Sequence, residues 1–144
     1  MFEARTLFHK ISYLQYPLML IGIYYAVQPY IVGFDYFFES VNNLLIFIGL
    51  GISVSTLQDT TTTQNEVSRK IWQDPKKGKL LLSVLGATTL FLIIAGMYGA
   101  YVSTSENFKE LSFGIIVLGI GLIGMLKAAI EMFENHRLDK NPPA

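Results

Sequence analysis

Four long segments without a charged residue alternate with short charged segments along this chain. Residues 11–34, 40–58 and 80–105 contain 24, 19 and 26 uncharged positions, and residues 111–126 contain 16. A helix needs about 20 residues to cross the hydrocarbon core of a bilayer. The fourth segment reaches 20 positions when it extends past Lys127 to Ile130, and a lysine near a helix end can extend its long side chain to the headgroups.

This pattern predicts an all-α integral membrane protein, with residues 1–144 forming a single membrane domain. Because lipid offers no water to open backbone groups, the segments should be helical. A soluble four-helix bundle is the alternative, but its helices would each need a polar face, and residues 80–102 carry no charge on any face. We therefore expect four transmembrane helices in an antiparallel bundle, at approximately residues 7–32, 39–57, 79–102 and 110–133.

The first segment has a second interpretation, as a cleaved signal peptide. Its uncharged run is longer than the core of about 7–15 apolar residues that is typical of a signal peptide, and Gln15, Pro17 and Gln28 interrupt it. We interpret it as a retained first span. Pro17 cannot donate a backbone hydrogen bond to the carbonyl of Tyr13, so we expect the helix to bend there.

The basic residues predict the orientation of the spans. Lys and Arg are retained on the cytoplasmic side of short loops. Lys109 is the single basic residue in the two loops that would lie outside. All the others lie before the first span, between the second and third, or at and beyond the end of the fourth: Arg5, Lys10, Arg69, Lys70, Lys76, Lys77, Lys79, Lys127, Arg137 and Lys140. We therefore expect both termini and the middle loop to be cytoplasmic, with the protein in the cell (inner) membrane.

Composition excludes several classes of function. The formal net charge is zero, which is unlike a basic nucleic-acid-binding protein, and 51% hydrophobic residues are incompatible with disorder. The absence of cysteine excludes disulfides and thiolate metal sites. The two histidines are far apart in sequence, and no phosphate-binding glycine loop occurs. We therefore expect no cofactor, no metal site, no nucleic-acid partner and no enzymatic activity.

The middle loop, residues 58–78, is the largest segment predicted to lie in water. Thr63-Gln64-Asn65-Glu66 matches a capping box that would start a short helix, ending at Asp74-Pro75. This helix would lie on the membrane surface with Trp72 as an anchor. The alternative is that the second span continues into the cytoplasm. We expect the polar tail, residues 134–144, to be flexible.

Small residues predict close helix packing. In lipid they allow backbones to approach closely. The fourth span carries a stripe of them, and Glu39-Ser40 followed by Gly49-Leu50-Gly51 resembles Glu110-Leu111-Ser112 followed by Gly119-Ile120-Gly121. This weak repeat reflects either chance or two related hairpins. The expected packing residues are Gly114, Gly121, Gly124 and Ala128.

Polar residues on the first two spans are the candidate site. They would line a polar cavity or an outer vestibule, with Glu39 attracting a cation, or they would act as hydrogen-bonding residues between helices. The sequence does not decide between these interpretations. The residues are Tyr16, Tyr24, Gln28, Glu39, Asn42, Asn43 and Ser53.

We expect a small accessory, assembly or scaffold protein of the membrane. Its partners would be the lipid bilayer and either further copies of itself or the other subunits of a membrane complex. The alternative is a homo-oligomeric channel or carrier for a small solute, lined by the polar faces of the first two spans. The expected cytoplasmic contact residues are Arg69, Lys70, Lys76, Lys77 and Lys79.

Overall fold

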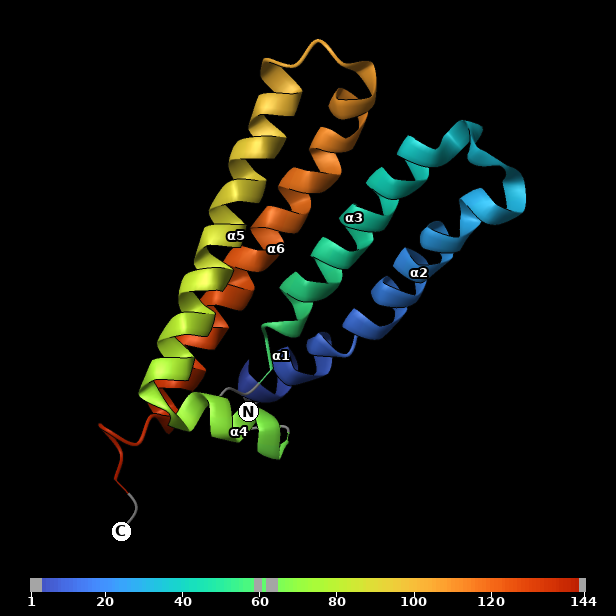
Figure 1. The fold of residues 1–144 in the computed structure, drawn as a ribbon. Coiled ribbons are helices and arrows are strands. Elements are labelled where there is room, and N and C mark those ends of the chain that lie inside the picture. Colours follow the sequence, from blue (N-terminus) through green and yellow to red (C-terminus); the bar gives the residue numbers. More distant parts are fainter. Residues whose placement is uncertain (1–3, 59–60, 62–64, 143–144) are drawn as a thin grey trace.

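The computed structural model describes residues 4–58, 61 and 65–142, and this part of the chain is all-helical, without a strand (Figure 1). Three segments are long and apolar enough to cross a membrane: Phe34–Ser55, Pro75–Tyr101 and Glu106–His136. The elements in chain order are α1 (Ala4–Ser12), α2 (Gln15–Val32), the short 3-10 helix η1 (Phe34–Tyr36), α3 (Phe37–Ser55), α4 (Glu66–Gln73), α5 (Pro75–Tyr101) and α6 (Glu106–His136).

The long helices form two antiparallel hairpins, α2–α3 and α5–α6 (Figure 1). The extensive contacts are between α2 and α3, between α3 and α6, and between α5 and α6. The helices therefore form a row, with α3 and α6 in the middle and α2 and α5 at its two ends. The two central helices run parallel to each other, so the expected antiparallel bundle is correct only within each hairpin.

The first predicted span, residues 7–32, is not one continuous helix. It is interrupted at Tyr13 and Leu14, between α1 and α2. Pro17 has no backbone N–H for the carbonyl of Tyr13, which instead accepts a hydrogen bond from the backbone N–H of Tyr16 at 3.2 Å. The expected bend is therefore a break that separates a short helix from α2. The helix that remains, α2, is 18 residues long.

Specific residues determine the helix ends at the turn between α2 and α3 and at the junction of α4 and α5. Gly33 adopts a φ of 118° at the end of α2, a conformation that favours glycine. At the opposite end of the long helices, Asp74 caps α5, and Pro75 occupies the first turn of α5. The Asp74 carboxylate accepts hydrogen bonds from the backbone N–H groups of Lys76 and Lys77, at 2.9 and 3.3 Å.

Small residues face the inside of the row and large apolar residues face outward. Gly22, Gly49, Gly96 and Gly121 are buried, whereas most large apolar side chains of α2 and α5 are exposed. A protein in water would bury such side chains, and an exposed apolar surface of this extent indicates contact with lipid or another apolar partner.

The middle loop contains a separate helix, α4, and not an extension of α3. Its N-cap is Asn65, whose side chain accepts a hydrogen bond from the backbone N–H of Ser68 at 2.8 Å. Thr63, the predicted cap, lies outside the described residues. Trp72 is buried against α6 beside Ala129 and Phe133, so the interpretation of Trp72 as a lipid anchor was wrong.

Candidate functional site

Along the seam where α3 and α6 pack together, the two backbones are so close that a carbonyl group of one helix leaves no room for a side chain on the other. A Cβ atom added at Gly121 would collide with the carbonyl oxygen of Gly49. One added at Gly49 would lie 2.8 Å from the backbone of Leu118 and from the carbonyl oxygen of Val117. Gly124 is less crowded, because an added Cβ would lie 3.2 Å from the hydroxyl of Thr56. Ala128, the last member of the expected stripe, is half-buried.

Asn42 connects the same two helices by a hydrogen bond. Its side-chain oxygen accepts from the backbone N–H of Gly114 at 2.7 Å. The absence of a side chain at Gly114 permits this approach, since an added Cβ would lie 2.6 Å from the carbonyl oxygen of Asn42. Asn42 and Gly114 are 72 residues apart, as are Gly49 and Gly121, so the parallel helices keep one register along the seam.

Asn42→Ala should destabilise the folded protein by about 0.6 kcal/mol, the mean value for hydrogen bonds inside membranes. Asn43→Ala is the matched control, because the side chain of Asn43 has no hydrogen-bond partner within the described part of the chain. Unfolding in detergent at a series of denaturant concentrations would measure both variants. Equal effects at the two positions would show that the bond to Gly114 contributes nothing.

Other polar residues of α2 and α3 make hydrogen bonds within the chain. The hydroxyl of Ser40, which is buried, donates a hydrogen bond to the side-chain oxygen of Gln28 at 3.2 Å. Ser53 donates to the carbonyl of Gly49 within its own helix, at 3.0 Å. Glu39 is exposed at the start of α3. The hydrogen bonds of Gln28, Ser40 and Asn42 therefore connect neighbouring helices. This is the second of the two roles that the sequence left open for the polar residues.

Tyr16 and Tyr24 point away from the rest of the chain. Their exposed fractions are 57% and 58%. Tyr24 lies near the middle of α2, and its hydroxyl has no hydrogen-bond partner among the described residues. The adjacent Tyr25 behaves differently, because its ring stacks on Phe47 of α3 at 5.6 Å between centroids. One face of α2 therefore packs on α3, and the opposite face presents tyrosines outward.

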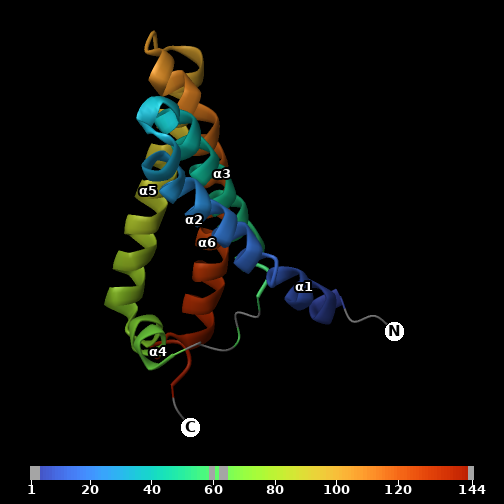
Figure 2. The same cartoon turned by 90° about the vertical axis from the view of Figure 1, so that its right-hand side faces the viewer.

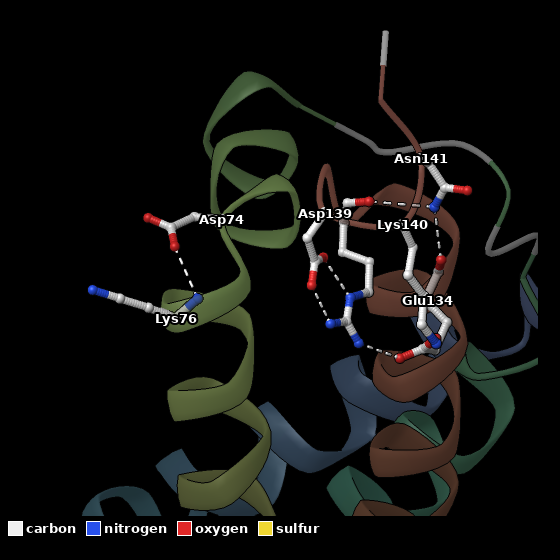
Figure 3. A network of polar contacts seen from close by, with 7 residues as sticks. Asp74, Lys76, Glu134, Asp139, Lys140 and Asn141 are labelled. Atoms are coloured by element: carbon white, nitrogen blue, oxygen red, sulfur yellow. Dashed lines mark hydrogen bonds and ion pairs between the residues drawn. The ribbon is translucent and has the colours of Figure 1, made fainter.

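Ion pairs join the tail to the end of α6 (Figure 3), and a backbone hydrogen bond joins it to the end of α4. Arg137 contacts the carboxylates of both Glu134 and Asp139, and its guanidinium lies 4.8 Å from the centre of the Phe133 ring. Lys140 also pairs with Glu134. The backbone N–H of Leu138 donates to the carbonyl of Gln73 at the end of α4, at 3.2 Å.

We refer to α4, the start of α5, the end of α6 and residues 137–141 as the cap. The described part of the tail is ordered in this cap, so the expectation of a flexible tail was wrong for these residues. The cap rests on a small apolar core, in which Trp72, Ala129 and Phe133 are packed by Leu82, Leu85 and Met132.

Three of the expected basic contact residues are partly engaged within the chain. Arg69 lies 3.8 Å from Glu66, and Lys77 lies 3.6 Å from Asp74. The charge of Lys79 lowers the pKa of Asp139, although the main cause of that lowering is the hydrogen bond from Arg137. Lys70 and Lys76 are exposed and make no ion pair among the described residues. The five basic side chains therefore all remain at the surface of the cap.

Acid should open the cap. Hydrogen bonds from Lys140 and Arg137 hold the pKa of Glu134 below its ordinary value, and Arg137 does the same for Asp139. Groups with a lowered pKa stabilise the fold above their ordinary pKa, near 4, and lose that contribution as the pH falls through the lower, folded value. Trp72 is the single tryptophan, so its emission should shift to the red below about pH 4.

The double variant Glu134→Gln, Asp139→Asn provides the control for this titration. It removes both carboxylates, so its emission at neutral pH should already resemble that of the acidified protein, and the acid transition should disappear. A red shift centred near pH 6 in the unchanged chain would contradict the assignment to these carboxylates.

The sequence did not predict the cap because its residues are far apart along the chain. Arg137 and Asp139 belong to an ordinary charged tail, and they come close to α4 through the hydrogen bond between Leu138 and Gln73 and the packing of Trp72 on Phe133. The available signal was Phe133, a large aromatic residue at the end of the fourth apolar segment, and Trp72 in the middle loop. Two large aromatic residues at the same end of a membrane protein are candidates for a shared core.

Comparison with known proteins returned no match: no family model, no curated protein and no solved structure is similar to this chain.

Proposed function

We propose that the chain is a four-span protein of the cell membrane with both termini in the cytoplasm, and that it acts as an accessory or scaffold subunit. The observation that carries this proposal is the outward face of α2. Among the four long helices, α2 alone is not among the segments long and apolar enough to cross a membrane. It packs on α3 at one end of the row, with Tyr24 exposed in its middle.

The other end of the row provides an internal comparison. In α5 the large exposed side chains in the middle of the helix are aliphatic or phenylalanine, such as Leu90, Phe91 and Ile94, which suit lipid. The hydroxyl of Thr88, also exposed there, donates a hydrogen bond to the carbonyl of Val84 within its own helix, at 2.9 Å. Tyrosine is common at the membrane interface, but Tyr24 lies mid-helix, where its hydroxyl would meet hydrocarbon. A neighbouring helix that offers a hydrogen-bond acceptor removes this cost. The outward face of α2 therefore suits a helix of a second protein or of another copy.

The basic loop is the second element of the proposed function. Lys70 and Lys76 are exposed on the cap, beside the partly paired Arg69, Lys77 and Lys79. Such a surface suits an acidic cytoplasmic partner. The alternative, a channel lined by the first two spans, is less well supported. Gln28, Asn42 and Ser53 are engaged in hydrogen bonds, so a path would have to form between copies, around Tyr16 and Tyr24.

Photo-crosslinking in intact membranes tests the proposal. Tyr24 is replaced by p-benzoylphenylalanine in one variant, and Phe91, which is 69% exposed on α5, is replaced in the matched control. We expect a discrete protein adduct from position 24 and none from position 91. Two differently tagged copies in the same cells distinguish a homo-oligomer from a complex with another protein. Absence of an adduct at position 24, or equal adducts at both positions, would contradict the proposal.

A further inference from the structure

The first helix, α1, leaves the row at the break before α2. Figure 2 shows α1 projecting from the base of the row at an angle to α2. The break occurs because Pro17 has no backbone N–H to donate. Beyond it, the backbone N–H of Leu18 donates to the carbonyl of Leu14 at 3.3 Å. α1 makes a few contacts with α3.

The apolar side of α1 is uncovered. Leu7, Phe8 and Ile11 lie three or four residues apart and share one face, and the exposed fractions of Leu7 and Phe8 are 42% and 47%. Thr6 and Lys10, on the other side of the helix, are exposed as well. Ile11 is half-buried, and Ser12, at the end of α1, is buried. The uncovered apolar surface of this amphipathic helix is therefore that of Leu7 and Phe8.

The length of α2 determines where α1 lies in the membrane. Eighteen residues at a rise of about 1.5 Å each are about 27 Å long, close to the thickness of the hydrocarbon core. If α2 spans the bilayer, which is part of the proposed function, its first residue, Gln15, lies at the cytoplasmic boundary. The break two residues earlier then places α1 at the level of the headgroups.

We infer that α1 lies on the cytoplasmic leaflet and binds anionic phospholipid. Leu7, Phe8 and Ile11 enter the boundary between headgroups and acyl chains, and the polar side faces the headgroups and water, as is typical of interfacial amphipathic helices. The sequence of α1 includes Arg5 and Lys10 and no acidic residue, so its charge is complementary to anionic headgroups. Pro17 sets the direction in which the helix leaves α2.

Because the chain contains no cysteine, single cysteines report on this surface directly. Phe8→Cys on the apolar side and Thr6→Cys on the polar side are each labelled with the fluorophore NBD, and the full-length protein is placed in lipid nanodiscs. Nitroxide-labelled lipids should quench the label at position 8 at least about twofold more than the label at position 6. A third variant combines Phe8→Cys with Lys10→Glu. In nanodiscs with phosphatidylglycerol it should be quenched less than Phe8→Cys alone, whereas in nanodiscs of phosphatidylcholine the two variants should be quenched equally.

Two results would overturn the inference. One is equal quenching at positions 6 and 8 in a protein that elutes as a single species. The other is an apolar emission spectrum at position 8 without quenching by lipid, which would show that another protein surface covers α1. Neither result depends on crosslinking at Tyr24, so a failure of this inference is distinguishable from a failure of the proposed function.

Discussion

Gly121→Ala should destabilise the folded protein by about 3 kcal/mol or more, the upper range for overpacking a close contact. The added methyl group would collide with the carbonyl oxygen of Gly49, and a backbone group in the middle of a helix cannot rotate away. The two central helices would have to separate. Gly49→Ala should act in the same direction, because its Cβ would lie 2.8 Å from the backbone of Leu118. Thermal unfolding in detergent, followed by circular dichroism, measures both.

Gly86→Ala is the matched control for the seam. Gly86 lies in the apolar part of α5, but the nearest atom to an added Cβ is the end of the Leu126 side chain, at 3.9 Å. Alanine favours helix over glycine by about 0.8–1.0 kcal/mol, so this variant should unfold at the same temperature or higher. If Gly86→Ala and Gly121→Ala lowered the unfolding temperature equally, the α3–α6 seam would not be the contact that holds the two hairpins together.

Phe133→Ala should have the second large effect, about 3–5 kcal/mol on the stability of the cap. The Phe133 side chain is 3% exposed, and its ring lies so close to Gly78 that no methyl group would fit there. The ring also carries the Arg137 guanidinium. Removal of the ring leaves a cavity beside Trp72. It also removes the contact with Arg137, the residue that pairs with Glu134 and Asp139.

The opening of the cap in this variant is measurable at α4. Trp72 emission should shift to the red, and hydrogen exchange over residues 66–73 should become faster, while α3 and the middle of α6 stay protected. Phe91→Ala, on the lipid-facing side of α5, is the control and should leave both signals unchanged. Protection of α4 that survives in Phe133→Ala would show that the cap does not depend on this ring.

The local structure followed from the sequence where a single residue determines it. Charge-free segments predicted the positions of the long helices, and the restriction before proline predicted the boundary at Asp74-Pro75. Pro17 was identified as a point of disturbance. Whether a proline bends a helix or ends it depends on what the next turns pack against, so the split into α1 and α2 needed the structure.

The order of the helices did not follow from the sequence. Glycines at Gly49, Gly114 and Gly121 predicted close contacts, but close contacts suit antiparallel and parallel neighbours equally. The same limit applied to the candidate site. Tyr16, Tyr24 and Gln28 were grouped in one candidate site, whereas Gln28 turns inward to Ser40 and the two tyrosines turn outward. A break in a helix changes which residues share a face. The spacing of residues in the sequence also does not show which face of a helix has a neighbour.

The weak internal repeat has a structural counterpart. The second helix of each hairpin lies in the centre of the row, and Ser40 and Ser112, which stand 72 residues apart, are both 2% exposed. The sequence pattern aligned Gly49 with Gly119, whereas the seam brings Gly49 against Gly121. These positions show that the two hairpins share one arrangement, with the second helix of each at the centre of the row. They also sharpen the contrast between α2 and α5, which occupy equivalent places but expose different side chains.

The most direct test of the four-span proposal is the accessibility of single cysteines in intact cells. Tyr36→Cys and Thr104→Cys lie at the two outer turns, and Lys70→Cys and Asn141→Cys lie in the cap, all at exposed positions. We predict that a membrane-impermeant maleimide labels the first pair in intact cells and the second pair only after permeabilisation. Thr6→Cys, in α1 and therefore before α2, should also react only after permeabilisation. Labelling of Thr6→Cys in intact cells, with Tyr36→Cys labelled from outside as well, would show that α2 does not cross the membrane and would contradict the proposal.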